Sequence, residues 1–256
     1  MSTAAVIAPA CQLAITILNS LVKTREMRQQ SQQLTQELES YREENAALRN
    51  KFEELQEHLT ANKLTSYEDL IKHDKEKADT LVNLANDTKK LDMQGLNIGL
   101  FGQTSTGKST MINSMLGEEV AETGYGETTT FAKPYESKMA NYTLHDLPGK
   151  NDSVSYFTME YIAFWKGLSS RVIVIEKTVK EMTTVIQLLD AIDLHYDLVV
   201  NKLDCVPEAE RESFKQKIQS EIKECNLKNC DHVWFVSAIN IQQFDWLQMV
   251  AALLPN

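Results

Sequence analysis

The sequence predicts an α/β fold, a mostly parallel sheet with helices on both faces, preceded by a long α-helical N-terminal region. Three observations support this prediction. All nine glycines lie between residues 95 and 167, and residues 10–94 contain neither glycine nor proline. Because these two residues most disfavour a helix interior, the first third is expected to be helical. After residue 95, short apolar runs such as LNIGLF alternate with helical patterns, which is typical of strands joined by helices.

Composition narrows the class of protein. The 256 residues include 26 Lys and Arg against 36 Asp and Glu, which gives a net charge of −10. No part of the chain has the basic excess that nucleic-acid binding requires, so we expect no nucleic-acid partner. The four cysteines are too few and too scattered for a disulfide framework, which fits a cytoplasmic location.

We divide the chain into residues 1–63, an apolar helix and a coiled coil; residues 64–93, an amphipathic helix; and residues 94–256, the α/β domain. Residues 4–22 carry no charge, and Lys23, Arg25 and Arg28 follow them. A stretch of this kind approaches the ~20 residues that cross a bilayer. Two interpretations remain open: contact with an intracellular membrane, with the rest of the chain in the cytosol, or packing against protein.

Residues 27–62 have a heptad pattern. Two apolar rows, offset by three and four residues, predict a seam between helices. The rows are Leu34, Tyr41, Leu48 and Leu55, and Leu38, Asn45, Phe52 and Leu59. A single buried Asn can fix the register of such a seam, so Asn45 is no objection. The alternative to a coiled coil and self-association is a long amphipathic helix packed within the same chain.

A second amphipathic helix is expected from Ser66 to Leu91, after a break at residues 63–65. Ser66 is a candidate N-cap, with Asp69 three residues further on. Leu70, Leu81 and Leu84 would form its apolar face.

The run LNIGLF leads into GQTSTGKS and then into a helical segment. This is a complete phosphate-binding loop in the strand-loop-helix context that such a loop requires. Backbone N–H groups and the helix N-terminus would hold phosphate oxygens, Lys108 would neutralise their charge, and the Ser109 hydroxyl would bind Mg²⁺. The residues predicted to bind the phosphates are Gly102, Gln103, Thr104, Ser105, Thr106, Gly107, Lys108, Ser109 and Thr110.

Four further motifs follow in order. The sequence GETTT places a threonine where it could reach the metal and the terminal phosphate; Thr129 is our assignment, with Thr128 and Thr130 as alternatives. The sequence DLPG offers Asp146 as a metal residue and the Gly149 N–H as a phosphate contact. The remaining motifs are NKLD, with Asn201, Lys202 and Asp204, and SA, with Ser237 and Ala238. Lys108, Thr129 and Gly149 are the candidate catalytic residues, and Ser109, Thr129 and Asp146 the candidate metal residues.

The NKLD motif predicts which base is bound. Guanine presents two adjacent N–H donors, and the Asp204 carboxylate can accept from both. Adenine has an acceptor at the corresponding ring nitrogen and no amine beside it, so the carboxylate would lose its bonds. Asn201, the stem of Lys202 and the Ala238 N–H would complete the base site.

The five motifs resemble those of the translation-factor-related GTPases, and NIGLFGQTSTGKSTMINSMLG, GYGETTTFAKPY and HDLPG are more narrowly similar to the immunity-related, interferon-inducible GTPases. The resemblance covers residues 94–256. It implies a Ras-like G domain, GTP and GDP as ligands with Mg²⁺, self-association through the G domain and, in many members, work at intracellular membranes. The sequence departs from that family at Gln103, where members have an acidic residue that acts across their dimer.

Two functions follow from these residues. Small GTPases orient the attacking water with a glutamine after the DxxG glycine, and this chain has Lys150 there. A cationic side chain cannot accept a proton, so intrinsic hydrolysis should be slow. The first function is a GTPase activated by G-domain dimerisation or self-assembly. The second is an assembly or interaction module gated by GTP, with negligible hydrolysis.

Overall fold

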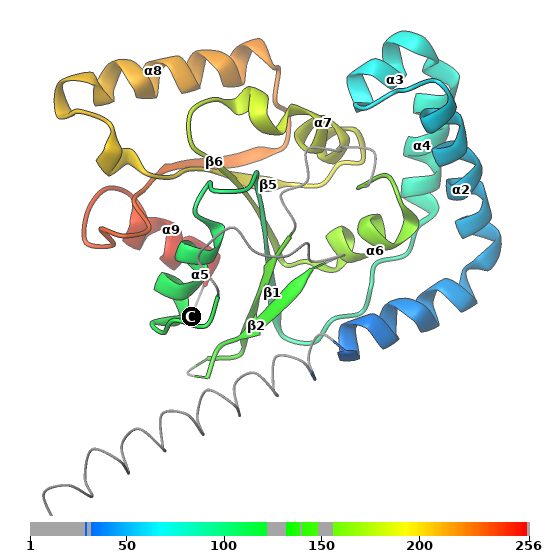
Figure 1. The fold of residues 1–256 in the computed structure, drawn as a ribbon, viewed down its shortest axis with the longest axis horizontal. Helices are drawn as coiled ribbons and strands as arrows, with labels where there is room; N and C mark the ends of the chain where they lie inside the picture. The colour runs from blue at the N-terminus through cyan, green and yellow to red at the C-terminus, as the bar shows by residue number, and fades with distance from the viewer. Residues whose placement is uncertain (1–28, 30–31, 122–131, 139, 148–155, 255–256) are drawn as a thin grey trace, which may run out of the picture.

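The computed structural model describes residue 29 and residues 32–121, 132–138, 140–147 and 156–254. Its six-stranded sheet has the order β2-β3-β1-β4-β5-β6 (Figure 1). Strand β2 runs antiparallel to β3, and every other neighbouring pair is parallel, which confirms the predicted sheet. The strands are β1 Leu96–Phe101, β2 Lys133–Glu136, β3 Tyr142–Asp146, β4 Ser170–Ile175, β5 Tyr196–Val200 and β6 Cys230–Phe235.

The register of the central strand determines which segments meet. Leu100 of β1 lies opposite Asp146 of β3 on one side and Val172 of β4 on the other. Because parallel strands end at the same edge of a sheet, the segments that follow β1 and β5 lie there together with the end of β3. This edge therefore collects residues 102–109, Asp146 and residues 201–204.

Helices cover both faces of the sheet (Figure 1). Alternate residues of the strands point to opposite faces. Val172 and Val174 belong to a hydrophobic cluster with α5 and α9, whereas Ile173 and Ile175 belong to a larger one with α6, α7 and Ile218 of α8. The helices are α5 Lys108–Leu116, α6 Met159–Gly167, α7 Thr183–Ala191, α8 Glu208–Glu224 and α9 Trp246–Leu253, with 3-10 helices η2 Val179–Met182 and η3 Leu203–Cys205.

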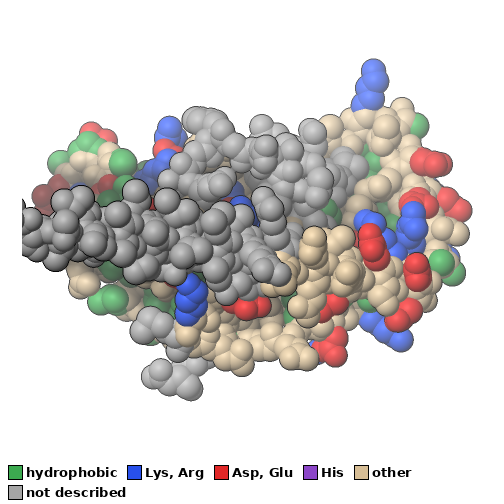
Figure 2. Space-filling view, turned by 60° about the horizontal axis from the view of Figure 1, so that its bottom comes forward, with side chains coloured by type: hydrophobic (Ala, Val, Ile, Leu, Met, Phe, Trp, Pro, Cys, Tyr) green, Lys and Arg blue, Asp and Glu red, His purple; other side chains and the backbone are tan. Residues whose placement is uncertain are grey.

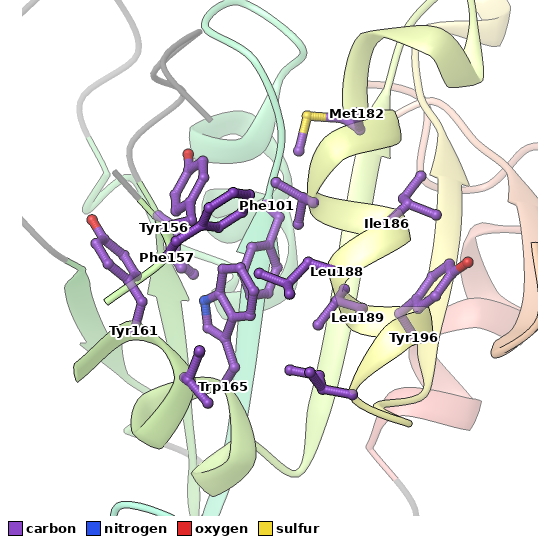
Figure 3. Packing of buried hydrophobic residues seen from close by; sticks show 14 of the residues in the cluster. Phe101, Tyr156, Phe157, Tyr161, Trp165, Met182, Ile186, Leu188, Leu189 and Tyr196 are labelled. Atoms are coloured by element: carbon purple, nitrogen blue, oxygen red, sulfur yellow. The ribbon is translucent and has the colours of Figure 1, made fainter. Parts of the chain in front are cut away.

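An aromatic cluster fixes α6 on the sheet (Figure 3). The ring of Phe101, the last residue of β1, meets the fully buried ring of Trp165 edge to face, with 5.4 Å between their centroids. Tyr156 and Tyr161 make a second edge-to-face pair beside them, at 5.2 Å. Aromatic burial of this kind is a large favourable term in folding.

The N-terminal helices pack on the α6 and α7 side of the sheet (Figure 1). Residues 32–44 are helical, and α2 Ala46–Ala61, α3 Tyr67–His73 and α4 Lys75–Asp87 follow them. The predicted break at residues 63–65 is confirmed, because α2 ends at Ala61. The predicted N-cap is confirmed too, since the Ser66 hydroxyl accepts the N–H of Asp69.

The heptad seam lies inside the chain's own core. The larger hydrophobic cluster includes its residues Leu34, Leu38, Phe52, Leu55 and Leu59 together with residues of α6 and α7. The structure therefore has the alternative arrangement, a helix packed within the same chain, and corrects the coiled-coil prediction. A heptad pattern indicates a buried stripe, and here the stripe packs against α6 and α7.

Asn45 lies at a break between two helical segments. Its backbone leaves the helical region (φ −116°, ψ 30°). Its side-chain amide donates to the carbonyl of Tyr41 at 2.9 Å, and its own N–H donates to the same oxygen at 3.1 Å, so the two donors share one acceptor at the break. Asn45 is the residue between the first helical segment and α2.

The expected helix from Ser66 to Leu91 is two shorter helices. Asp74 separates them, because its backbone is non-helical (φ −152°, ψ 89°). Its carboxylate accepts the N–H of Lys77 and so caps α4. An Asp at this position favours a new N-cap over continuation of the helix. Helix α4 then ends at Asp87, before Leu91.

Several contacts attach the N-terminal helices to α6. The Leu91 N–H donates to the carbonyl of Ala163 at 2.8 Å. The Lys166 ammonium donates to the carbonyls of Ala85 and Thr88 at the end of α4. At Gly167 any Cβ would lie 2.4 Å from the Leu91 carbonyl oxygen, so the two backbones approach too closely for another residue.

The exposed surface of these helices carries mixed charge. Acidic and basic side chains are interspersed over the right-hand end of the face in Figure 2, where the N-terminal helices lie. Two (i, i+4) pairs on this part are Arg49 with Glu53 and Lys72 with Glu68. Among the described residues, no helix has the length and apolar character to cross a membrane. Residues 4–22 lie outside the described part.

Candidate functional site

The segment after β1 brings its backbone close to neighbouring strands and loops. A Cβ on Gly102 would lie 2.4 Å from the carbonyl oxygen of Val174 in β4. Gly107 has φ +94°, and a Cβ there would lie 2.3 Å from Nδ2 of Asn201. Only glycine fits both positions without displacing its neighbours. Helix α5 starts directly afterwards at Lys108, so its N-terminus faces this loop.

Lys108 lies folded over the loop. Its ammonium donates to the carbonyls of Gly102 at 2.8 Å and Gln103 at 3.1 Å, and the residue is 8% exposed. Burial lowers the pKa of this lysine, and the Asp146 carboxylate acts in the opposite direction. The chain thus holds a buried cation beside backbone N–H groups, an arrangement that suits an anionic ligand.

Ser109 and Asp146 meet as predicted. The Ser109 hydroxyl lies 3.3 Å from Oδ2 of Asp146 and donates to it. Burial raises the pKa of Asp146, against the lowering effect of Lys108. The other carboxylate oxygen, Oδ1, is buried and has no hydrogen-bond partner among the described residues. A hydroxyl next to a buried, unsatisfied carboxylate oxygen is a donor set that fits Mg²⁺.

Asn201 connects the two halves of the site. Its side-chain N–H donates to the carbonyl of Thr106 at 2.9 Å, and its side-chain oxygen accepts the N–H of Ala238 at 3.0 Å. The residue is 3% exposed, so both bonds are shielded from water. The sequence places Asn201 and the Ala238 N–H around the base; the structure also bonds them to each other and to the phosphate-binding loop.

Lys202 and Asp204 lie on the adjoining turn. Lys202 has a left-handed backbone (φ +63°, ψ 32°), and the N–H of Cys205 donates to its carbonyl at 2.9 Å. Its ammonium pairs with Glu176 at 2.6 Å. Asp204 is half-buried, and its carboxylate lies 3.8 Å from the Cys205 sulfur.

The SA motif is fixed to α5 and to its own loop. The carbonyl of Ala238 accepts the hydroxyl of Ser114 at 2.6 Å. Ser237 is fully buried, and its hydroxyl accepts the N–H of Asn240 at 3.1 Å. The backbone of the motif is thereby held beside Asn201.

The other predicted residues divide into two groups. In the loop, Thr104 and Ser105 are exposed, Ser105 has φ +71°, and the half-buried Thr110 lies in the first turn of α5. The second group lies outside the described residues, so the predicted roles remain predictions. It comprises Thr128, Thr129, Thr130, Gly149 and Lys150.

Sequence reasoning missed one part of the site, the segment between β4 and α7. Glu176 pairs with Lys202, and the carbonyl of Glu181 accepts the side-chain amide of Gln103 at 3.1 Å. Neither residue belongs to a recognised motif. Their one signal in the sequence is their position after a buried strand that ends at the same edge as β1.

Comparisons with known proteins agree with this geometry. The model of the 50S ribosome-binding GTPase family matches residues 97–237. The "Probable GTP-binding protein EngB" of Mycoplasmoides gallisepticum is 28% identical over 185 residues, which cover 67% of this chain and 92% of that protein. The "Interferon-gamma-inducible GTPase 10" of Mus musculus is 29% identical over 205 residues, 72% of this chain. The present chain spans only 48% of that relative.

Two solved structures that match part of the chain have low TM-scores. A single-residue variant of Aquifex aeolicus Era, bound to GDP and AlF4−, has a TM-score of 0.44 and 17% identity, over 62% of this chain and 57% of that one. A probable GTP-binding protein engB has a TM-score of 0.40 and 19% identity, over 60% of this chain and 93% of the other.

Proposed function

Because this chain belongs to the 50S ribosome-binding GTPase family, we propose that it binds GTP and GDP with Mg²⁺ and hydrolyses GTP slowly. One observation carries the proposal. Asn201 bonds both to Thr106 of the phosphate-binding loop and to Ala238 of the SA motif, so the phosphate and base sides form one site.

The chain's own residues have distinct roles in this proposal. The Lys108 ammonium leaves its two carbonyl partners in part to neutralise the β and γ phosphates. Ser109 and Asp146 hold Mg²⁺, which supplies charge neutralisation at the phosphates. Asp204 accepts the two N–H donors of guanine and so rejects adenine. A buried polar pairing of this type discriminates against the unpaired base by several kcal/mol.

Isothermal titration with GDP and ADP tests the base assignment. GDP should bind at least about a hundredfold more tightly. In Asp204→Asn the side-chain amide can donate to the C2 carbonyl of xanthine. This variant should therefore lose affinity for GDP and gain affinity for xanthosine diphosphate. Asp92→Asn, which removes an exposed carboxylate elsewhere, should bind GDP as the unchanged chain does. Equal GDP and ADP affinities would refute the assignment of Asp204.

Lys108→Ala tests the phosphate side. It should abolish binding of both GDP and GTP while the far-UV circular dichroism spectrum stays that of the unchanged chain. Retained affinity would mean that the phosphate site lies elsewhere.

Slow turnover and activation by self-association are the finer part of the proposal. Lys150 in place of a water-orienting glutamine supports slow hydrolysis. Phosphate release should therefore be slow in dilute protein and its specific rate should rise with protein concentration as G domains dimerise. A rate that does not change with concentration contradicts dimer activation. No release at all favours the alternative, a GTP-gated assembly module.

The relation to interferon-inducible GTPases is supported by the 29% identity to the mouse relative. That family's acidic residue is Gln103 here, and its amide donates to Glu181 of the same chain. We therefore propose that Gln103 positions its own loop, and that activation across a dimer uses other residues. Gln103→Glu should leave the concentration dependence of phosphate release unchanged; a steeper dependence would indicate action across the dimer.

We also propose that the protein is cytoplasmic and that residues 4–22 attach it to an intracellular membrane. Their lack of charge and the basic residues that follow support this. Flotation with liposomes should recover the full chain in the lipid fraction, and a chain that lacks residues 1–23 should stay at the bottom. Equal flotation of the two would refute a role for this segment. We expect no nucleic-acid partner.

A further inference from the structure

The segment between β4 and α7, residues 176–182, contacts both sides of the proposed nucleotide site. On the base side, the Glu176 carboxylate lies 2.6 Å from the Lys202 ammonium. On the phosphate side, the carbonyl of Glu181 accepts the Gln103 amide at 3.1 Å. These residues lie far apart in sequence and meet only in the fold.

The segment is held firmly at its beginning and in its middle. The Asn201 N–H donates to the carbonyl of Ile175, the residue before Glu176, at 2.9 Å. From α8, the Glu221 carboxylate accepts the hydroxyl of Thr178 at 2.8 Å and the N–H of Val179 at 2.9 Å. Glu221 is 7% exposed and Val179 is fully buried. Glu176 therefore starts from a fixed backbone.

The Lys202 side chain is held at its ammonium by the Glu176 carboxylate. The NKLD motif predicts that the aliphatic stem of this lysine forms part of the base site. A lysine stem is flexible and costly to immobilise. Lys202 has a left-handed backbone, and its ammonium donates to the Glu176 carboxylate at 2.6 Å. An ion pair at the tip leaves the stem fewer conformations while its apolar surface stays available.

We propose that Glu176 is a positioning residue for guanine binding, which acts by holding the Lys202 ammonium so that the lysine stem lies along the base. The proposal rests on the proposed function, because it assumes that residues 201–204 bind guanine. The competing interpretation is an ordinary surface ion pair, since the Lys202 and Glu176 side chains are 33% and 29% exposed. Such a pair would affect stability slightly and base binding not at all.

Two ligands and four proteins separate these interpretations, with a fifth protein as the control for net charge. The proteins are the unchanged full chain, Glu176→Gln, Lys202→Met and the double variant; the ligands are GDP and inorganic pyrophosphate, each with Mg²⁺. Met keeps an apolar stem and removes the ammonium. Glu176→Gln should weaken the affinity for GDP by about two- to fivefold, which is the contribution of one partly exposed ion pair. The affinity for pyrophosphate should not change. In the Lys202→Met background the same substitution should have no further effect. Glu57→Gln, an exposed carboxylate of α2, controls for the change in net charge.

Each other outcome overturns the proposal. Unchanged GDP affinity in Glu176→Gln means that the pair is only a surface contact. Equal losses for GDP and pyrophosphate mean that Glu176 supports the loops and not the base. A loss that persists with Lys202→Met means that Glu176 acts by another route. The earlier titration with GDP and ADP separates this failure from that of the proposed function. If the unchanged chain binds pyrophosphate but binds GDP and ADP equally well, the proposed function fails and this proposal fails with it.

Discussion

The side-chain amide of Asn201 donates to the backbone carbonyl of Thr106 at 2.9 Å, across 95 residues of sequence. This bond joins the loop after β5 to the loop after β1. Gly107, the next residue after Thr106, is therefore fixed against the same side chain. The base and phosphate sides of the site share one buried hydrogen-bonded residue.

Asn201→Ala should destabilise the fold and weaken GDP binding together. The substitution leaves the Thr106 carbonyl and the Ala238 N–H without this partner in a buried place, which should lower the free energy of unfolding by about 1–3 kcal/mol. Urea denaturation gives the stability, and titration with GDP gives the affinity. Asn62→Ala removes an exposed bond to His58 and should change the stability by less than about 0.5 kcal/mol. Similar losses in the two variants would contradict the connecting role of Asn201.

Two glycines with left-handed backbones give a matched pair. Gly107 and Gly117 have φ +94° and +69°, but a Cβ meets Asn201 only at Gly107; at Gly117 nothing lies within 4 Å. Gly117→Ala should cost about 1 kcal/mol in the free energy of unfolding, from backbone strain alone. Gly107→Ala should cost more and also reduce GDP affinity. If both variants bind GDP equally well, the close approach at Gly107 does not matter to the site.

His145 should make stability depend on pH. Its Nε2 lies 2.9 Å from Oδ1 of Asn97, whose amide donates to Gln94 and Gly95, so Nε2 is the donor. Burial lowers the pKa of His145 to about 4, from an ordinary 6.5. As the pH falls, His145 takes up its proton in the unfolded chain before it does so in the folded one. The contribution of neutral His145 to stability is therefore complete above pH 6.5 and is lost as the pH falls toward 4.

The loss at pH 5 should be about 2 kcal/mol in the free energy of unfolding. Urea denaturation at pH 7.5 and 5.0 measures it, and His145→Gln should show a correspondingly smaller decrease between the two values. His195 is an internal contrast. A hydrogen bond to Asp231 raises its pKa, so its contribution is complete at low pH and is lost as the pH rises through the folded-state pKa. An unaltered pH dependence in His145→Gln would show that the fold does not shift the pKa of His145.

The ion pair between Arg42 and Glu160 should matter more than an exposed one. The two side chains meet at 2.6 Å, and the Glu160 side chain is 9% exposed. Arg42→Ala removes the cation from this buried carboxylate and should lower the free energy of unfolding by about 1–2 kcal/mol. Lys72→Ala breaks an exposed (i, i+4) pair with Glu68 and should cost at most about 0.5 kcal/mol. Thermal denaturation of both variants checks the order, and the reverse order would contradict this assignment.

Local motifs made much of the fold and the site predictable. The phosphate-binding loop and the Ser66 cap depend on residues whose spacing dictates their geometry, and Ser109 and Asp146, both predicted as metal residues, lie side by side through the pairing of β1 with β3. The mostly parallel sheet with helices on both faces follows from alternating strands and helices. The family comparison agrees with this part of the prediction.

The rest depends on contacts that the sequence does not encode locally. A heptad pattern predicts that a stripe of the helix is buried but not which surface buries it. It therefore left undecided whether Leu38 and Leu59 pack against another helix in a coiled coil or against the same chain. Helices break at Asn45 and Asp74, where a polar side chain hydrogen-bonds a nearby backbone group, and hydrophobic periodicity does not measure such bonds. Glu176 reaches Lys202 only through the pairing of β4 with β5, so no motif includes it.

The attachment of the N-terminal helices has a consequence for how the molecule unfolds. Leu59, Leu81 and Trp165 belong to one hydrophobic cluster, and the Leu91 N–H is bonded to Ala163 of α6. The nucleotide-binding part and the helices therefore form one cooperative unit, with a single transition in heat or denaturant. Cleavage at residue 93 would not release an independent domain; it would uncover the apolar side of α6 and α7 to water.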